Sequence, residues 1–385
     1  MNPPRLSRRM QNLAASPIRE ILKVIDRPGM ISFAGGLPAA ESFPELPQHI
    51  PAKYLQYGPS EGEPELRQEV AKMLCSRGLD CTDDQLLILS GSQQGIDLVA
   101  KLMIQTGTKV GIEYPTYLAA LQVFGLYGAS YQPLSDLDHD TPLAYVIPTF
   151  QNPTGHCYSE AQRLKLAQQC DRFGTTLFED DPYSDLVYEK VCRTPVCSML
   201  QKSSWIYQGS FSKSLSPGLR LGYMACSHDL MPYLTHLKQA ADLHSNRISQ
   251  YIVFQALTDP GYAGRMSRLQ DAYRSKRDFF EQQLQKHLGE LASWSLPAGG
   301  LFFWLSLKPS INCDPASLFE KAIENNVAFM PGDFFYPENQ CEHPTMRLNF
   351  SHAGESDIDR GLGILARLIV EQHRSNSPPN RLRTG

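Results

Sequence analysis

The sequence predicts an α/β fold in which a doubly wound, mainly parallel sheet is joined to a smaller α+β domain. Short, nearly continuous apolar runs alternate along the chain with stretches of helical periodicity, as in parallel sheets that helices cover on both faces. A length of 385 residues also exceeds what one simple hydrophobic core usually supports. More than one domain is therefore expected.

Five apolar runs are the expected strands of the large domain. They are residues 85–91, 108–113, 143–150, 175–180 and 204–210. The helix expected after the first run places Ile96, Val99, Ala100 and Met103 on one face. The expected parts of the chain are an N-terminal arm or small-domain segment (1–44), the large domain (45–270), the small domain (271–372) and a disordered tail (373–385).

Composition excludes several classes of protein. The net charge of -4 argues against a nucleic-acid partner, and no apolar run reaches the roughly 18 residues of a membrane span. The nine cysteines form no CxxC pair and no zinc pattern, so we expect no metal, reduced thiols and a cytoplasmic protein. The start of the chain, with four arginines before its first acid, mildly resembles a transit peptide, but an ordered arm is the favoured interpretation.

Polar loops follow the five expected strands. In an open parallel sheet the carboxyl ends of the strands meet at one edge, where ligands bind. The loops that reach this edge are 90–93 (Ser-Gly-Ser-Gln), 114–117 (Tyr-Pro-Thr-Tyr), 152–155 (Asn-Pro-Thr-Gly), 180–183 (Asp-Asp-Pro-Tyr) and 210–213 (Ser-Phe-Ser-Lys). A hydroxyl-rich loop, an aromatic ring, an amide, an acid and a lysine are thus expected together.

Two of these loops carry groups that need partners. Ser92 opens a helix whose free N–H groups suit a phosphate, although an ordinary N-cap is the simpler interpretation of this serine. Asp180 ends a buried strand and needs a cationic partner, which is either a structural arginine or the protonated ring nitrogen of a ligand.

Lys213 lies in the segment "GSFSKSLSPGLRLGY". An exposed loop lysine is the simple alternative, but a buried lysine with a lowered pKa is a nucleophile suited to Schiff-base formation. The neighbours Ser210, Ser212 and Arg220 favour the second interpretation, because hydroxyls and an arginine bind a phosphate dianion.

Pyridoxal phosphate satisfies all of these requirements at once. It has an aldehyde for Lys213, a ring nitrogen for Asp180, and a phosphate for the helix N-terminus and Arg220. Its flat ring and its phenolic oxygen suit three further residues at the edge, which are Tyr117, Asn152 and Tyr183.

The set of motifs "GSQQ", "YPTY", "FQNPTG", "EDDPY", "GSFSKSLSPGLRLGY" and "MRLNFS" resembles the fold-type I, class I/II aminotransferases. The resemblance is strongest to the 2-aminoadipate/kynurenine aminotransferase branch, which "SPIREILKV", "GMISFAGGLPAAESFP" and "LQYGPSEGEPELRQ" fit too, and it runs from about residue 16 to 370. It implies a large domain like that of aspartate aminotransferase.

The resemblance also implies residue roles. Lys213 forms the Schiff base, Asp180 pairs with the ring nitrogen, Tyr117 stacks on the ring, and Asn152 and Tyr183 hold the ring oxygen. The phosphate ligands it implies are Ser92, Gln93, Ser210, Arg220 and, from the other subunit of a homodimer, Tyr57, with Ser212 beside them. The substrate ligands it implies are Arg347 for the α-carboxylate, Asn152, Gly36 and, for a distal carboxylate, Arg19.

The implied activity is a ping-pong transamination from an L-amino acid (2-aminoadipate, leucine, methionine or an aromatic one) to 2-oxoglutarate or another 2-oxo acid. Fold alone does not decide the reaction, so β-elimination, decarboxylation or racemisation in a biosynthetic pathway stays open. A sensor fused to a DNA-binding domain is disfavoured, because the resemblance begins by residue 16 and the charge is wrong. A phosphate-binding protein without cofactor chemistry would not need Asp180.

The sequence departs from the family pattern at one place. The connection around residues 134–144 is about a dozen residues shorter than the helix-bearing connection usual there. It lies away from the motifs, so only that side of the sheet and a dimer edge are in doubt.

Overall fold

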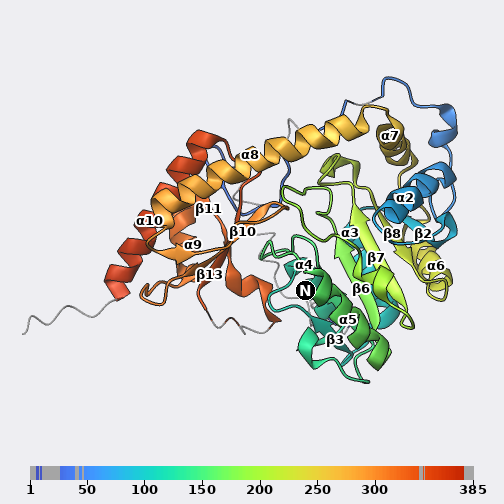
Figure 1. The fold of residues 1–385 in the computed structure, drawn as a ribbon, viewed down its shortest axis with the longest axis horizontal. Helices are drawn as coiled ribbons and strands as arrows, with labels where there is room; N and C mark the ends of the chain where they lie inside the picture. The colour runs from blue at the N-terminus through green and yellow to red at the C-terminus, as the bar shows by residue number, and fades with distance from the viewer. Residues whose placement is uncertain are drawn as a thin grey trace, which may run out of the picture. The chain divides into compact units, whose positions relative to one another are not determined.

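The computed structural model describes residues 6–7, 9–10, 27–39, 43–45, 47–337, 341 and 343–376. The chain divides into two compact units. The first contains Leu37–Ala272 and Ala298–Gly300, and the second contains Tyr273–Pro297, the chain from Leu301 onward and the described residues 27–36. Helix α8 (Tyr262–Leu288) begins in the first unit and ends in the second (Figure 1).

The first unit is built on a seven-stranded sheet. Its strands, in spatial order, are β2 (Leu86–Leu89), β8 (Gly222–Cys226), β7 (Trp205–Ser210), β6 (Thr176–Asp181), β5 (Leu143–Val146), β3 (Lys109–Ile112) and β4 (Ser130–Pro133). Neighbouring strands from β7 to β4 are parallel, whereas β8 runs antiparallel to both β7 and β2. The predicted mainly parallel sheet is confirmed, and β4 and β8 are strands that the sequence analysis did not anticipate.

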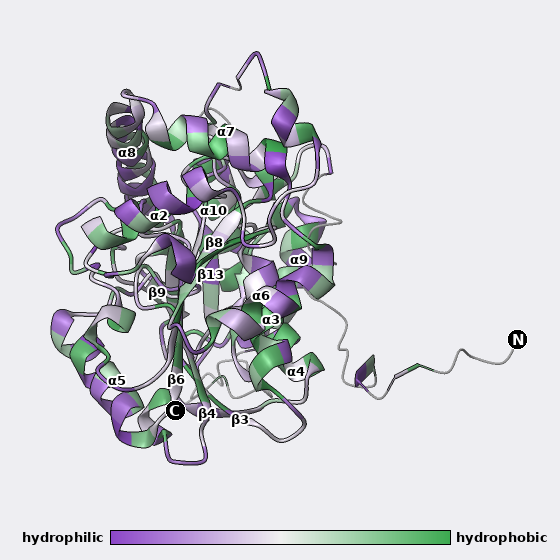
Figure 2. Cartoon of the chain, turned by 90° about the vertical axis from the view of Figure 1, so that its right-hand side faces the viewer, coloured by the Kyte–Doolittle hydropathy of each residue, from purple (hydrophilic) through white to green (hydrophobic). Residues whose placement is uncertain are grey.

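Helices cover both faces of this sheet. Because side chains alternate along a strand, Leu86 and Ile88 of β2 pack with one group of helices, and Leu87 and Leu89 pack with another. The first group is α2 (Pro64–Ser76), α5 (Glu160–Phe173) and α7 (Arg247–Thr258), and the second is α3 (Ser92–Met103), α4 (Leu118–Leu126) and α6 (Met231–Asp242). Figure 2 shows the surface helix α5 as striped by hydrophobic and hydrophilic residues. This is the predicted doubly wound arrangement.

The connection from β4 to β5 is short, as the sequence suggested. It contains one turn of 3-10 helix, η5 (Leu134–Asp136), before β5 begins at Leu143. Both strands pair with β3, one on each side, so this connection crosses β3 without the α-helix that usually links parallel strands.

The second unit contains a four-stranded sheet and a two-stranded pair. The four strands, in spatial order, are β12 (Met330–Pro331), β13 (Thr345–Asn349), β10 (Phe302–Leu307) and β9 (Ala292–Ser293). The parallel pair is β1 (Ile31–Ser32) and β11 (Val327–Ala328), and the helices are α9 (Pro315–Glu324), α10 (Glu355–Asn376) and the end of α8. Its core includes the packed aromatic side chains of Phe33, Phe280, Phe303 and Phe350.

Helix α10 continues to Asn376, so residues 373–376, which we expected in a disordered tail, are helical. The rest of that tail lies outside the described residues. Among the helices that the structure describes, none is long and apolar enough to cross a bilayer.

Candidate active site

The predicted polar loops lie at one edge of the seven-stranded sheet. Strands β3, β5, β6 and β7 are parallel to one another. Strand β2 runs in the same direction as β7, because β8 is antiparallel to both. The carboxyl ends of all five strands therefore reach the same edge, where a doubly wound sheet binds its ligand.

Asp180 is held at this edge by two neutral donors. Its Oδ2 accepts a hydrogen bond from Tyr145 Oη at 2.8 Å, and its Oδ1 accepts one from Gln208 Nε2 at 3.0 Å. Gln208 lies directly opposite Asp180 in the pairing of β6 with β7. No lysine or arginine of the described ranges forms an ion pair with this carboxyl group, so the alternative of a structural arginine is wrong for these residues.

Burial dominates the electrostatics of Asp180. The side chain is 3% exposed, and desolvation raises its pKa to about 6, against the opposing effects of Gln208 and Tyr145. A cation placed against this carboxylate would stabilise its charged form. The protonated ring nitrogen of pyridoxal phosphate is such a cation, so the site fits this part of the cofactor.

Tyr183, three positions after Asp180, contacts Asn152 from another loop of the same edge. Asn152 Nδ2 donates to Tyr183 Oη at 3.3 Å, and both residues are 4% exposed. Asp181 fixes the turn that carries Tyr183, because its carboxylate accepts from Ser184 N at 3.1 Å and from Tyr207 Oη at 2.7 Å. These contacts bring together the two groups predicted to hold the ring oxygen.

Gln151 joins the loop of Asn152 to the loop that precedes Tyr117. Its Nε2 donates to the carbonyl of Pro115 at 2.7 Å, and its Oε1 accepts from Thr154 N at 2.8 Å. Tyr117 is the N-cap residue of α4 and is half-buried. The two loops therefore hold each other in position.

The N-terminus of α3 forms a cradle with Arg220. The N-cap residue is Gly91, with φ of 84°, and no side chain caps the helix. The interpretation of Ser92 as the N-cap is therefore wrong. A Cβ atom on Gly91 would lie 2.6 Å from Arg220 Nη2, so the guanidinium group sits directly against this glycine. Gly222 packs as closely, since a Cβ there would lie 3.0 Å from Ser92 N.

This cradle suits a phosphate group. The first amides of α3, which include those of Ser92 and Gln93, point along the positive end of the helix dipole, and the guanidinium group beside them supplies a full charge. Arg220 is exposed and has a left-handed backbone, with φ of 48° and ψ of 49°. The exposure fits a side chain that is available to a ligand instead of packed in the core.

Lys213 lies in a tight turn just after β7. It is half-buried, between the buried residues Ser212 and Ser214, so the alternative of an exposed loop lysine does not describe it. Ser210 Oγ accepts from Ser212 N at 3.2 Å and thereby orders the start of the turn. Arg265 Nη2 donates to the carbonyl of Ser214 at 2.8 Å and fixes its end.

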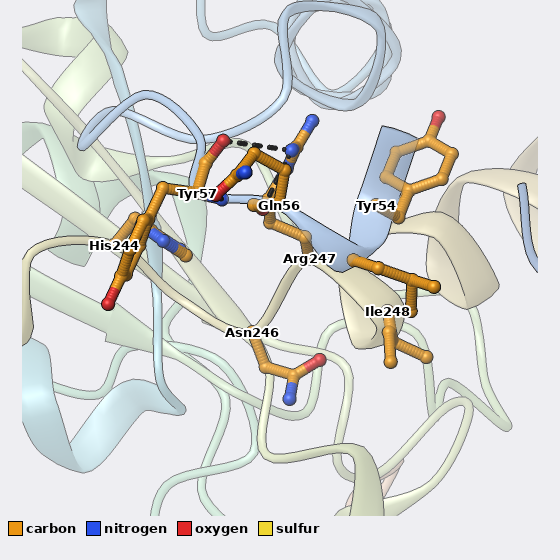
Figure 3. A pocket seen from close by; sticks show the side chains of 8 residues that line it. Tyr54, Gln56, Tyr57, His244, Asn246, Arg247 and Ile248 are labelled. Carbon is orange, nitrogen blue, oxygen red and sulfur yellow. Dashed lines mark hydrogen bonds between the residues drawn. The ribbon is translucent and has the colours of Figure 1, made fainter. Parts of the chain in front are cut away.

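Tyr57 projects from the surface of the first unit. Its side chain is 76% exposed, although its ring contacts that of His244 with the centroids 5.8 Å apart (Figure 3). Arg247 Nη1 donates to the carbonyls of Gln56 at 2.8 Å and Tyr57 at 3.0 Å, so the backbone is fixed while the ring is accessible.

Two of the expected substrate residues, Arg347 and Gly36, belong to the second unit, whereas Asn152 belongs to the first. Arg347, in β13, is 6% exposed, and its guanidinium carbon lies 4.2 Å from the centroid of the Phe302 ring. Its Nη2 donates to the carbonyl of Ala34, two positions before the half-buried Gly36, so Arg347 and Gly36 lie on neighbouring segments. Arg19 lies outside the described residues.

The sequence analysis missed the residues that orient Asp180. Tyr145 and Gln208 lie inside strands read only as apolar runs, "LAYV" and "WIYQGS". Each is fully buried. A hydroxyl or amide group in a buried strand needs a hydrogen-bond partner, so these two polar side chains could have predicted a partner at this depth of the sheet.

Comparison with known proteins identifies the family. Residues 37–365 match the model of "Aminotransferase class I and II". The chain is 34% identical to a 2-aminoadipate transaminase of Thermus thermophilus (93% of this chain and 94% of that protein) and 32% identical to an aromatic-amino-acid aminotransferase of Thermococcus litoralis (95% and 94%).

Solved structures agree with the sequence matches. The kynurenine aminotransferase of Pyrococcus horikoshii, determined in complex with PMP, superposes with a TM-score of 0.88 at 31% identity, over 95% of this chain and 97% of that one. The predicted aspartate-aminotransferase-like fold and the predicted cofactor are confirmed. The chain therefore belongs to the class I and II aminotransferases and is a transaminase that uses pyridoxal phosphate.

Proposed function

We propose that this transaminase follows a ping-pong reaction, in which an L-amino acid gives up its amino group before a 2-oxo acid accepts it. When bound, pyridoxal phosphate supplies an aldehyde that takes the amino group and a ring that accepts electrons from the substrate α-carbon. The residues of the chain hold the cofactor, bind the substrate and move the proton.

The environment of Asp180 carries the proposal. This carboxyl group is buried, has only neutral donors in Tyr145 and Gln208, and has a pKa raised to about 6 by burial. Such an arrangement stabilises a cation that arrives with a ligand, as a ring nitrogen does when it is protonated.

The other residues at the edge have roles that follow from their chemistry. When the cofactor is bound, Lys213 Nζ would hold it at its aldehyde carbon, and as a free amine it would remove the substrate α-proton and later return it. Asn152 and Tyr183 donate hydrogen bonds to the ring oxygen, and Tyr117 stacks on the ring. The phosphate ligands are Ser92, Gln93, Ser210 and Arg220, with Ser212 beside them. The uncapped N-terminus of α3 and the contact of Arg220 with Gly91 support the roles of Ser92, Gln93 and Arg220.

Arg347 binds the α-carboxylate of the substrate. Its planar guanidinium group presents paired donors that match a carboxylate, and Phe302 and Ala34 fix its orientation. Asn152 and Gly36 assist it, and Arg19 binds a distal carboxylate. The amino donors are 2-aminoadipate, leucine, methionine and aromatic amino acids, with 2-oxoglutarate as acceptor. The names of the Thermus and Thermococcus relatives support the first and last of these donors.

The active enzyme is a homodimer in which Tyr57 of each subunit completes the phosphate site of the other. The exposure of Tyr57, on a backbone that Arg247 fixes, supports this role.

Substitution of Lys213 tests the reaction. In Lys213→Ala the base that moves the α-proton is gone, so we expect transamination from every donor to fall at least about a hundredfold. Lys202→Ala, a change at an exposed loop lysine, is the matched control and should keep wild-type rates. Near wild-type turnover by Lys213→Ala would refute the assignment. Release of ammonia without an amino acceptor would indicate elimination in place of transfer.

A further inference from the structure

A cluster of charged and polar groups lies behind the phosphate cradle, in the first unit, and no step proposed so far uses it. It consists of Lys238 and Asp242 at the end of α6 and of Ser245 in the turn before α7. Lys238 is fully buried and Ser245 is 1% exposed. A buried lysine is costly unless its charge is compensated by nearby partners.

The ammonium group of Lys238 has three partners. Nζ donates to Asp242 Oδ1 at 2.6 Å, to Asp242 Oδ2 at 2.8 Å and to Ser245 Oγ at 2.9 Å. Ser245 Oγ donates in turn to the carbonyl of Ile88 in β2 at 3.0 Å. The cluster is therefore attached to the strand that leads into the cradle.

Asp242 also binds the cradle loop directly, at both of its ends. Its Oδ2 accepts from Ser90 Oγ at 2.7 Å and from Gln94 Nε2 at 2.8 Å. Gln94 Oε1 accepts from Ser90 N at 2.9 Å. These contacts enclose Gly91, Ser92 and Gln93, whose backbone forms the cradle, so the loop is held by one carboxylate from behind.

The backbone at Leu243 is strained where the cluster requires it. Leu243 has φ of 65° and ψ of -58°, and His244 N donates to the carbonyl of Asp242 at 2.7 Å, which closes a γ-turn of the rare form. Residues other than glycine rarely adopt this conformation. The turn directs Asp242 and Ser245 to the same ammonium group, and the hydrogen bonds of the cluster offset its cost.

We propose that Asp242, supported by Lys238 and Ser245, is a positioning residue that fixes loop 90–94 in the shape that binds the cofactor phosphate. The inference rests on the proposed function, in which α3 binds that phosphate. A phosphate site gains affinity when its amides are fixed before the ligand binds. Loss of the contacts that hold loop 90–94 should therefore lower the affinity for the phosphate without changing the attachment of the cofactor to Lys213.

The double variant Lys238→Met/Asp242→Leu tests this role. It removes both charges together, so the net charge beside the phosphate position does not change. The matched control is Asp97→Leu/Lys101→Met, which removes another i,i+4 ion pair from α3 itself, away from the cradle. Gln94→Met is a second variant that releases the loop without touching a buried charge.

Apoprotein of each variant is titrated with pyridoxal phosphate and, separately, with pyridoxal, which lacks the phosphate; absorbance of the lysine-bound form gives each Kd. We expect the Kd for pyridoxal phosphate to rise at least about tenfold in the double variant and in Gln94→Met, because each loses one or two hydrogen bonds. The Kd for pyridoxal should not change. The control should bind both as the wild type does.

Arg220→Ala separates the failure of this inference from failure of the proposed function. If Arg220→Ala weakens pyridoxal phosphate alone while the double variant and Gln94→Met bind it normally, the phosphate site stands and the positioning role is wrong. If Arg220→Ala has no phosphate-specific effect, the phosphate site itself is wrong and the inference falls with it. Equal weakening of both ligands by the double variant and by Gln94→Met would indicate a general structural role and also overturn the inference.

Discussion

At the scale of single residues, the chemistry of the site depends on how each neighbour changes the charge of Asp180. Burial raises its pKa to about 6, and the hydrogen bonds from Gln208 and Tyr145 lower it from the value that burial alone would give. Only the ionised form pairs with a protonated ring nitrogen. Affinity of the apoprotein for pyridoxal phosphate should therefore decrease as the pH falls through about 6.

Tyr145→Phe should move this decrease to higher pH. The substitution removes the donor at 2.8 Å from Asp180, so the carboxyl group takes up its proton more readily, by an amount that corresponds to about 1 kcal/mol or somewhat less than one pH unit. The measurement is the Kd for pyridoxal phosphate between pH 5 and 8. Titration of the cofactor itself affects all variants equally, so it does not change the comparison between them. Tyr127→Phe is the control, since Tyr127 also donates to an aspartate, Asp97. Superimposable pH curves for Tyr145→Phe and wild type would contradict the role of Tyr145.

At the scale of elements, the function depends on how closely the start of α3 approaches the segment before β8. Glycine is required at position 91 for two reasons, a positive φ of 84° and the contact with Arg220. In the sequence, the phosphate site was indicated only by a serine-rich loop before a helix. The structure adds that the loop is shaped by glycine and backed by arginine.

Gly91→Ala should weaken pyridoxal phosphate more than pyridoxal, because the new Cβ would lie 2.6 Å from Arg220 Nη2 and displace the guanidinium group. Gly107→Ala is the matched control: Gly107 has φ of 85°, but no atom lies within 4 Å of a Cβ there. Both variants place an alanine at a positive φ. For each variant we take the ratio of the Kd for pyridoxal phosphate to the Kd for pyridoxal, and the difference between the two ratios measures the effect of the contact with Arg220. Equal ratios would show that Arg220 does not act on the phosphate.

Sequence patterns predicted the strands that are buried on both faces, because such strands are continuous apolar runs. They did not predict β4, which is half-exposed and contains a proline, or β8, whose first two residues, Gly222 and Tyr223, end the motif that contains Lys213. The site residues at strand ends were predictable, since topology alone brings them together. The support of the cradle by Asp242 was not, because Ser90 and Asp242 are 152 positions apart and only the packing of α6 against α3 joins them.

At the scale of the whole molecule, carboxyl groups whose pKa is raised by desolvation influence how the stability of the apoprotein depends on pH. Burial raises the pKa of Glu113 to about 8, of Glu179 to about 7 and of Asp180 to about 6. The folded chain therefore binds more protons than the unfolded chain between about pH 4 and 8. Each group destabilises the fold increasingly as the pH rises from its unfolded pKa of about 4 to its folded pKa, and this destabilisation is relieved as the pH falls.

The free energy of unfolding of the apoprotein should accordingly increase as the pH is lowered from 8 to 6. His156, whose pKa burial lowers, acts in the opposite direction only below its ordinary value of 6.5. Urea titrations of cofactor-free protein at pH 6, 7 and 8 measure the effect, and Glu113→Gln should flatten the change between pH 7 and 8. A stability that rises from pH 6 to 8 would contradict these pKa assignments.

The absorbance spectrum of the purified protein, recorded before and after addition of L-2-aminoadipate alone, tests the proposed half-reaction most directly. We predict a yellow protein whose lysine-bound cofactor band gives way to that of pyridoxamine phosphate, because the roles proposed for Lys213 and Asp180 allow the amino group to be transferred without an acceptor. A yellow protein that does not change would keep the cofactor site and reject 2-aminoadipate as the donor. A protein that stays colourless with added pyridoxal phosphate would contradict the assignment of Lys213 and Asp180.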